Sequence, residues 1–184
     1  MKQLFEIDLH DYEAGDDVFC RPSARGIMIG ECGKIALVYS ENEKYYKFPG
    51  GGIRQNEDKK DALIREVREE TGLIVIPESV SEFGSVLRRQ KSNITPHTIF
   101  EQENFYYICK VENEVAEQNL DDYEKEAGFV LKFVDLDEAI KTNAAYRSED
   151  AFNEIMIKRE TEVLRLVKAE CKESYILHSG RFIC

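Results

Sequence analysis

The sequence predicts an α/β fold in which helices cover both sides of a mixed β-sheet. Segments with strand character alternate with segments of helical periodicity along the chain, which favours this layered class. The 184 residues, 42% of them hydrophobic, are enough to bury a core without metal or disulfide staples. No internal repeat or low-complexity linker interrupts the chain. We therefore expect a single domain over residues 1–170, followed by a C-terminal extension over residues 171–184.

The β-prone segments come first and then return after a helix. Glu31 to Gly33 form a turn between the first two strands, and residues 45–48 lead into three consecutive glycines. The acidic stretch 113–127 reads as an exposed loop before the last strand. The expected strands are residues 21–30, 34–40, 73–76, 82–89, 105–111 and 129–134.

Three helices are expected: one that carries the acidic residues 66–70 and ends at Thr71, and two at about residues 137–142 and 148–168. Asn56 or Asp58 suits the start of the first helix, and Gly72 suits the left-handed position after its end. Its buried face is expected to be Ala62, Leu63 and Val67. For the apolar C-terminal extension three arrangements remain possible: it adds a strand, docks on the domain, or is buried in a dimer interface.

The first helix carries an acidic pattern that points to a metal site. Glu66, Glu69 and Glu70 lie at roughly 0°, 300° and 40° around a helix of 3.6 residues per turn, so their carboxylates share one face. Like charges this close destabilise a helix unless a cation joins them. Mg²⁺ and Mn²⁺ prefer carboxylate and carbonyl oxygens. A solvated acidic helix is the alternative, but it would not also require glycines and an arginine at fixed spacing.

Those glycines and that arginine complete a known signature. From Gly51 to Leu73 the chain reads Gly, five residues, Glu57, seven residues, and then Arg65-Glu66-Val67-Arg68-Glu69-Glu70-Thr71-Gly72-Leu73. In this it resembles the Nudix hydrolases. The resemblance implies an α/β/α sandwich and hydrolysis of a nucleoside diphosphate linked to another moiety, by attack of a metal-activated water on the pyrophosphate.

The resemblance also implies roles for individual residues. Glu66, Glu69 and Glu70 would hold Mg²⁺ or Mn²⁺, and a main-chain carbonyl, from Gly51 or from its neighbour Gly50, would often add a ligand. The residues expected to brace this site are Glu57, Arg65 and Gly50. Arg65 lies four residues before Glu69, so an ion pair can orient that carboxylate.

The general base and the substrate contacts come from other parts of the chain. Glu66 or Glu69 can act as the base, and in many Nudix hydrolases a later loop supplies it, which here offers Glu124 or Glu126; we expect Glu126. Guanidinium groups match phosphate, so the expected substrate contacts are Arg25, Arg88 and Arg89, the alternative being a solvated basic turn. Further candidates are Arg21 and Lys91 for phosphate, and Tyr45, Tyr46 and Phe48 for stacking a base, with Phe48 more suited to the core.

Composition restricts the partners. A formal charge of -11 disfavours a nucleic acid polymer and leaves a small nucleotide carried in with metal. The chain has neither an apolar leader nor a run long enough to span a membrane, and its five cysteines form no CxxC pair, so we expect a cytoplasmic protein with reduced thiols and no membrane partner. The oligomeric state is open, although homodimers are frequent among the family members that this chain resembles.

Two functions from different classes fit this chain. The first is a pyrophosphohydrolase acting on a nucleoside triphosphate, a nucleotide sugar, ADP-ribose or a dinucleotide. The second is a Nudix domain that senses such a compound without cleaving it. The complete set of Glu66, Glu69 and Glu70 favours the enzyme, because a sensor has no need of all three.

Overall fold

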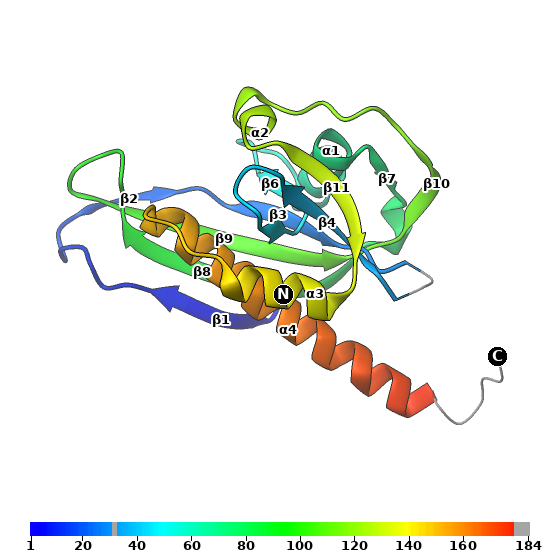
Figure 1. The fold of residues 1–184 in the computed structure, drawn as a ribbon. Coiled ribbons are helices and arrows are strands. Elements are labelled where there is room, and N and C mark those ends of the chain that lie inside the picture. The colour runs from blue at the N-terminus through cyan, green and yellow to red at the C-terminus, as the bar shows by residue number, and fades with distance from the viewer. Residues whose placement is uncertain (31–32, 179–184) are drawn as a thin grey trace.

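The computed structural model describes residues 1–30 and 33–178, and it confirms the predicted α/β/α layering (Figure 1). Its main sheet has the strand order β1-β8-β9-β3-β6, and β2 also pairs with β9. Strands β8 and β9 are antiparallel, whereas β1 runs parallel to β8 and both β2 and β3 run parallel to β9. The strands of this mixed sheet are β1 (Gln3–Asp8), β2 (Asp17–Cys20), β3 (Ser23–Ile27), β6 (Gly50–Gly52), β8 (Ser81–Lys91) and β9 (Thr98–Ile108).

Two smaller sheets complete the strand layer. Strand β4 (Ile35–Ser40) pairs with β11 (Phe129–Val134) on one side and β5 (Tyr46–Lys47) on the other. Strand β7 (Leu73–Val75) pairs with β10 (Val111–Val115). Strands β1 and β2 were not expected from the sequence, and β9 begins seven residues before the segment predicted for it.

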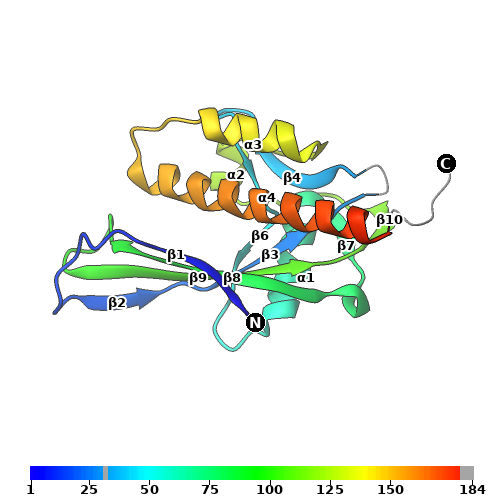
Figure 2. The ribbon, with the colours of Figure 1, turned by 90° about the horizontal axis from the view of Figure 1, so that it is seen from below.

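The hydrophobic core lies on both faces of the main sheet. Helices cover these two faces (Figure 2). Helix α1 (Lys59–Thr71) buries Leu63 and Val67 against Phe105 on one face. Helix α4 (Ala151–His178) packs on the opposite face, where Tyr106 joins the other core cluster. Phe105 and Tyr106 are neighbours on a strand, so their side chains point to opposite faces. Each fully buried large apolar side chain stabilises the fold by roughly 1.5–3 kcal/mol before entropy is counted.

The helices correct two predictions. The stretch expected to be a loop contains β10 and a short helix, α2 (Asp122–Glu126), whose start is closed by reciprocal hydrogen bonds between Asp121 and Glu124. The last helix continues to His178, so residues 171–178 add no strand, and residues 179–184 lie outside the described residues. Helix α3 (Leu136–Ala145) covers the segment predicted for it.

Two further findings concern the whole described chain. None of its described helices has the length and apolarity needed to cross a membrane. Cys20, Cys109 and Cys171 are free thiols.

Candidate active site

A cleft opens beside the glycine strand β6, between helix α1, the strands β8 and β9, helix α2 and the start of α4. Its volume is about 560 Å³. The acidic side chains that line it are Glu66, Glu70, Asp121, Glu124 and Asp150. Basic groups line the cleft too, and these are Arg21, Arg25, Lys47 and Arg88. The aromatic side chains that line it are Phe100, Tyr123 and Phe152.

Helix α1 presents two of the predicted metal ligands to this cleft. Its start is fixed by Asp58, whose side chain accepts a hydrogen bond from the Lys60 amide, and it ends at Gly72 with φ of 75°. Because Leu63 and its apolar neighbours are buried against the sheet, the helix cannot rotate about its axis without exposing them. Glu66 and Glu70, four residues apart, therefore stay on the cleft side.

Glu70 is buried and already has two partners. Its Oε1 lies 2.6 Å from Lys47 Nζ, and its Oε2 accepts a hydrogen bond of 2.9 Å from the Gly50 amide. Only 1% of the residue is exposed, and a buried carboxylate is costly unless it has hydrogen-bonding partners such as these.

Glu66 lies directly against the glycine strand. A Cβ added to Gly51 would come within 2.2 Å of Glu66 Oε2, so the lack of a side chain at this position lets the carboxylate approach the main chain. Burial raises the pKa of Glu66, and this outweighs the lowering effect of Arg65, whose Nη1 lies 2.5 Å from Glu66 Oε1.

Arg65 braces the region as predicted from the spacing. Its Nε and Nη2 donate to the two oxygens of Glu57 at 2.7 and 2.8 Å, and Nη2 also donates to the Gly52 carbonyl at 3.1 Å. The hydrogen bonds from Arg65 lower the pKa of Glu57 to about 2. The expected ion pair with Glu69 is present, at 3.1 Å. Glu69, however, lines a neighbouring hollow instead of the cleft.

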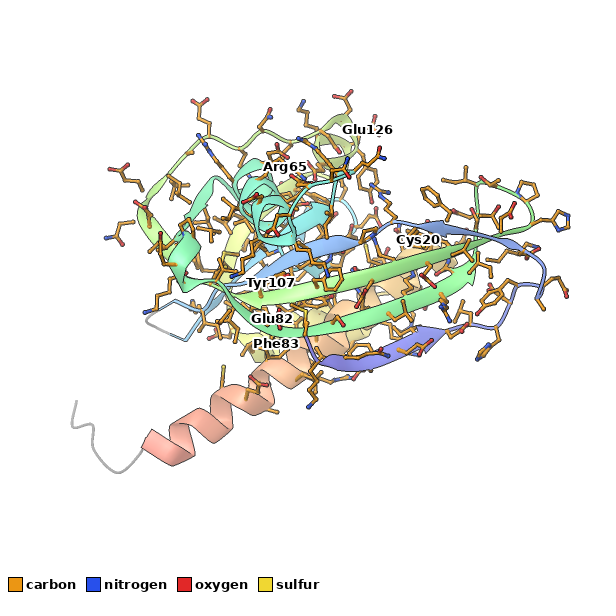
Figure 3. All side chains as sticks on the ribbon, turned by 180° about the vertical axis from the view of Figure 1, so that it is seen from behind. Cys20, Arg65, Glu82, Phe83, Tyr107 and Glu126 are labelled. Carbon is orange, nitrogen blue, oxygen red and sulfur yellow. The ribbon has the colours of Figure 1, made fainter. Side chains whose placement is uncertain are left out.

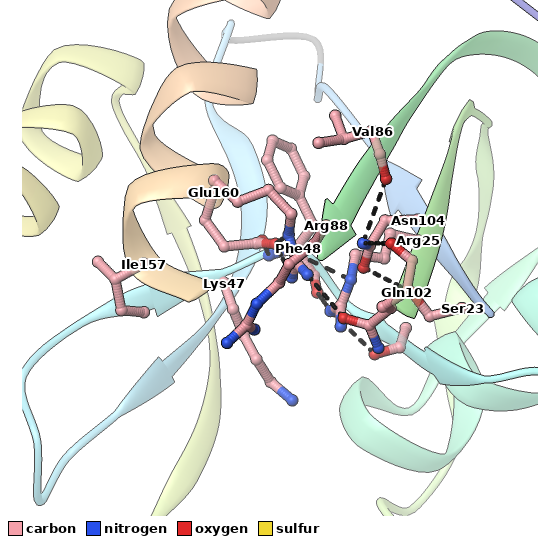
Figure 4. A network of polar contacts seen from close by, with 12 residues as sticks. Ser23, Arg25, Lys47, Phe48, Val86, Arg88, Gln102, Asn104, Ile157 and Glu160 are labelled. Carbon is pink, nitrogen blue, oxygen red and sulfur yellow. Dashed lines mark hydrogen bonds and ion pairs between the residues drawn. The ribbon is translucent and has the colours of Figure 1, made fainter. Parts of the chain in front are cut away.

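Charged side chains from two layers hold the turn before β6 (Figure 4). Glu160 of α4 accepts a hydrogen bond of 2.7 Å from the Phe48 amide. Arg25 of β3 donates from Nη1 to the carbonyls of Phe48 and Gly50, at 3.2 Å each. The Pro49 carbonyl accepts from the Gly26 amide at 2.8 Å. Together with Glu70 of α1, which accepts from the Gly50 amide, partners on three elements therefore fix the main-chain groups of this turn.

The Glu160 carboxylate is ionised in this buried network. Burial opposes its charge, but Arg159 and Arg25 lower the pKa of Glu160 below its ordinary value. Arg159 lies 2.6 Å from Glu160 Oε1, and Arg25 Nε lies 3.8 Å from the same oxygen. Arg25 Nε has no hydrogen-bond partner within the described part of the chain, and Arg25 lines the cleft. The network thus leaves positive charge beside the cleft.

The two neighbouring arginines of β8 are separated by the sheet. Arg88 is 1% exposed, stacks over the Phe152 ring at 4.0 Å and donates from Nη2 to the Phe152 carbonyl. Burial lowers the pKa of Arg88 to about 9. Arg89 points to the opposite face and pairs with Glu101 at 2.6 Å. Arg88 therefore lines the cleft, and Arg89, expected to contact the same substrate, does not.

Helix α2 corrects the choice between the two later glutamates. Glu124 lines the cleft, and burial together with the charge of Glu70 raises the pKa of Glu124 to about 7. Glu126 is exposed at the outer end of α2 (Figure 3), and it does not line the cleft. The two residues fall on opposite sides because α2 turns by about 200° between positions two apart.

The donor groups of the cleft fit a hard divalent cation. Glu66, Glu70 and Glu124 offer only oxygen atoms, which Mg²⁺ and Mn²⁺ prefer. Across residues 1–30 and 33–178, no three acidic, histidine or cysteine side chains are gathered as a metal cage. These carboxylates form ion pairs within the protein instead: Lys47 pairs with Glu70, and Arg65 pairs with Glu66 and Glu69.

Several cleft residues were not found from the sequence. Tyr45 and Tyr46, considered for base stacking, are buried in the core together with Phe48. The cleft aromatics come instead from β9, α2 and α4, far apart in the chain, and only the tertiary structure brings them together. Lys47 was missed because nothing in a tyrosine-rich strand marks its side chain as the partner of a glutamate 23 residues later.

Comparisons with known proteins agree with this geometry. The model of the NUDIX domain matches residues 21–154. Human "Nucleoside diphosphate-linked moiety X motif 6" is 38% identical over 80 residues, which covers 42% of this chain and 23% of that protein. The RNA pyrophosphohydrolase of Pseudomonas aeruginosa (strain LESB58) is 38% identical over 53 residues, which covers 29% of this chain and 33% of that protein. The matches thus span a third or less of either relative.

Two solved structures share the fold. The NUDIX hydrolase from Nitrosomonas europaea has a TM-score of 0.53 and 20% identity, and the alignment covers 77% of this chain and 89% of that one. The MutT protein from Bacillus halodurans has a TM-score of 0.52 and 17% identity, over 75% and 80% of the two chains. At these identities the likeness concerns the fold alone.

Proposed function

Because this chain belongs to the Nudix family, we propose that it is a metal-dependent hydrolase that cleaves the pyrophosphate bond of a nucleoside diphosphate linked to another moiety. The observation that supports this proposal most is the composition of the cleft. The partly buried carboxylate of Glu66 and the buried carboxylate of Glu70 share one cavity with the arginines Arg25 and Arg88. A pyrophosphate with its cation needs both kinds of group within one cavity.

Each residue has a defined task in this proposal. When bound, Mg²⁺ or Mn²⁺ neutralises charge on the phosphoryl oxygens and lowers the pKa of a water molecule. Glu66 and Glu70 hold the cation, Glu69 adjoins them on the same helix, and the Gly51 carbonyl is the expected main-chain ligand.

The remaining tasks concern the phosphate and the attacking water. Arg25 and Arg88 hold the phosphate by charge. Glu124 accepts a proton from the attacking water, in place of Glu126, because Glu124 lies in the cleft.

The substrate is a small nucleotide in this proposal. Phe152 and Tyr123 offer ring faces in the cleft on which a nucleobase can stack. The name of the Pseudomonas relatives brings in RNA as a second candidate, which the net charge of -11 disfavours. The alternative function is that of a Nudix domain that binds the nucleotide as a sensor without cleaving it.

A substrate panel tests the proposal. The purified protein is incubated with nucleoside triphosphates, nucleotide sugars, ADP-ribose, dinucleotides and a 5′-triphosphorylated RNA, with Mg²⁺ or Mn²⁺ and with a chelator as control. Release of nucleotide or phosphate from one class, abolished by the chelator, is the expected result. If a nucleotide stabilises the protein thermally but no panel member is hydrolysed, the protein is a nucleotide-binding domain and the proposed enzymatic function is wrong. Light scattering measures the molar mass of the same preparations and so establishes whether the protein is a homodimer.

A further inference from the structure

The cleft contains a cation to which the proposed function gives no task. Lys47, in strand β5, is 8% exposed, and its Nζ lies 2.6 Å from Glu70 Oε1. The same Nζ lies 4.2 Å from the centre of the Phe129 ring. An aromatic face attracts an ammonium group, so Lys47 has a second favourable contact besides Glu70.

Both oxygens of Glu70 are already in use. Oε2 accepts from the Gly50 amide, and Oε1 faces Lys47. A divalent cation that binds Glu70 must therefore displace one partner. The Gly50 amide belongs to a turn whose other main-chain groups are tied to Glu160 and Arg25. Lys47 has a flexible four-carbon side chain, so it is the partner that can move.

We propose that Lys47 is a built-in competitor of the divalent cation at Glu70. This inference rests on the proposed function, since it assumes that Glu70 holds the metal. Without metal, the ammonium group neutralises Glu70, whose charge also acts on Glu124. When metal binds, two positive charges cannot share Oε1 at this distance, and Nζ withdraws to the Phe129 ring. Lys47 therefore lowers the affinity of the cleft for its metal.

Titration calorimetry with Mn²⁺ alone, without nucleotide, tests the competition. We expect Lys47→Met to bind Mn²⁺ at least about fivefold more tightly than the unaltered protein, the lower end of a typical coupling between two ligands. Methionine keeps an unbranched chain against Phe129. Lys47→Gln is the second variant, because its amide still donates to Glu70 and preserves the fold if methionine does not. Lys47→Arg keeps the charge and should bind Mn²⁺ as weakly as the unaltered protein.

Lys125→Met is the matched control for net charge. Lys125 lies on α2 beside the cleft, is exposed, and pairs with Asp122 instead of Glu70. This control should leave the Mn²⁺ affinity within about twofold of the unaltered value, because exposed charges are screened. A second readout is the melting temperature, which Mn²⁺ should raise more in Lys47→Met and Lys47→Gln than in the control.

Unchanged or weaker Mn²⁺ binding in both neutral variants would overturn the competition. If such variants still show chelator-sensitive hydrolysis, the proposed function stands and only the role of Lys47 is lost. If neither the unaltered protein nor any variant binds Mn²⁺, and no panel substrate is cleaved, both proposals fall.

Discussion

Three glutamates around the glycine turn differ in what surrounds them, and these surroundings decide what each can do. Glu70 is neutralised by Lys47, Glu57 is paired with Arg65, and Glu124 has no ion pair in the described structure. The hydrogen bonds from Arg65 lower the pKa of Glu57 to about 2, so Glu57 accepts protons poorly. The unpaired Glu124, with a pKa raised to about 7, is therefore the group suited to take a proton.

Glu124→Gln should lower kcat by about 100-fold or more, because the amide cannot accept the proton of the attacking water. Glu126→Gln is the matched control, since Glu126 lies on the same short helix but is exposed and outside the cleft. Steady-state kinetics on the substrate found in the panel measures both. Equal losses in the two variants would remove Glu124 from the mechanism.

At the scale of elements, the turn into β6 depends on contacts from α1, β3 and α4. Gly51 is the position where it passes closest to α1, since a Cβ there would lie 2.2 Å from Glu66 Oε2. The next glycine is different, because a Cβ on Gly52 would meet nothing closer than 3.8 Å. An added methyl group at Gly51 would crowd the Glu66 carboxylate, whereas one at Gly52 would only reduce main-chain flexibility. Substitutions at the two glycines therefore distinguish these two effects.

Gly51→Ala should lower kcat by about 100-fold, because displacing a ligand by about 1 Å costs this much in a positioned site. Gly52→Ala should retain activity within about threefold, since its methyl group has space. Kinetics and Mn²⁺ titration of the two variants measure the difference. Similar activities would mean that Glu66 has no need of its approach to the main chain.

Helix α4 holds the same turn through Glu160. Glu160→Gln should lower the free energy of unfolding by about 3–5 kcal/mol, because it leaves Arg159 and Arg25 buried without their counter-ion. Glu162→Gln removes a partly exposed glutamate that pairs with Arg165, three positions further along the same helix, and should cost no more than about 0.5 kcal/mol. Urea denaturation compares them. Equal stabilities would show that the buried pair contributes nothing net.

The brace between Glu57 and Arg65 predicts a pH dependence of stability. The folded pKa of Glu57 is about 2, below its ordinary 4.5. Its contribution is therefore complete above about pH 4.5 and is lost as the pH falls toward 2. Glu57→Gln should lower the free energy of unfolding at pH 7 by about 1–3 kcal/mol. Urea midpoints at pH 7 and pH 3 should show this deficit shrinking; a constant deficit would contradict the pairing.

At the scale of the whole molecule, local patterns predicted the layers but not the connections between them. Helix α1, its caps and its buried face follow from residues within 14 positions, so the sequence was sufficient. Strand β1 is partly exposed and β2 is fully exposed, and both are parallel to partners distant in the chain, a pairing that no local pattern marks. The helix α2 was hidden because its acidic residues also suit a loop.

The cleft, too, was predicted from the sequence only where its contacts are local in the chain. The signature located Glu66, Glu70 and the Arg65 brace, because these contacts lie on one helix and the turn before it. Arg89 was misplaced because the orientation of its strand relative to the cleft depends on which neighbours it pairs with. Lys47 and Phe152 belong to segments that meet the cleft only after folding.

The central claim is that carboxylates of α1 hold a divalent cation for hydrolysis. The most direct test compares hydrolysis of the best panel substrate by the unaltered protein and by Glu66→Gln, each with Mg²⁺ and with chelator, after melting curves have shown that both are folded. Our account predicts that the chelator abolishes turnover by the unaltered protein. It also predicts that Glu66→Gln loses at least about 100-fold in kcat with metal present, since even partners outside the ligand shell commonly cost 10–100-fold. Equal rates for the two proteins, or turnover that survives the chelator, would contradict the account.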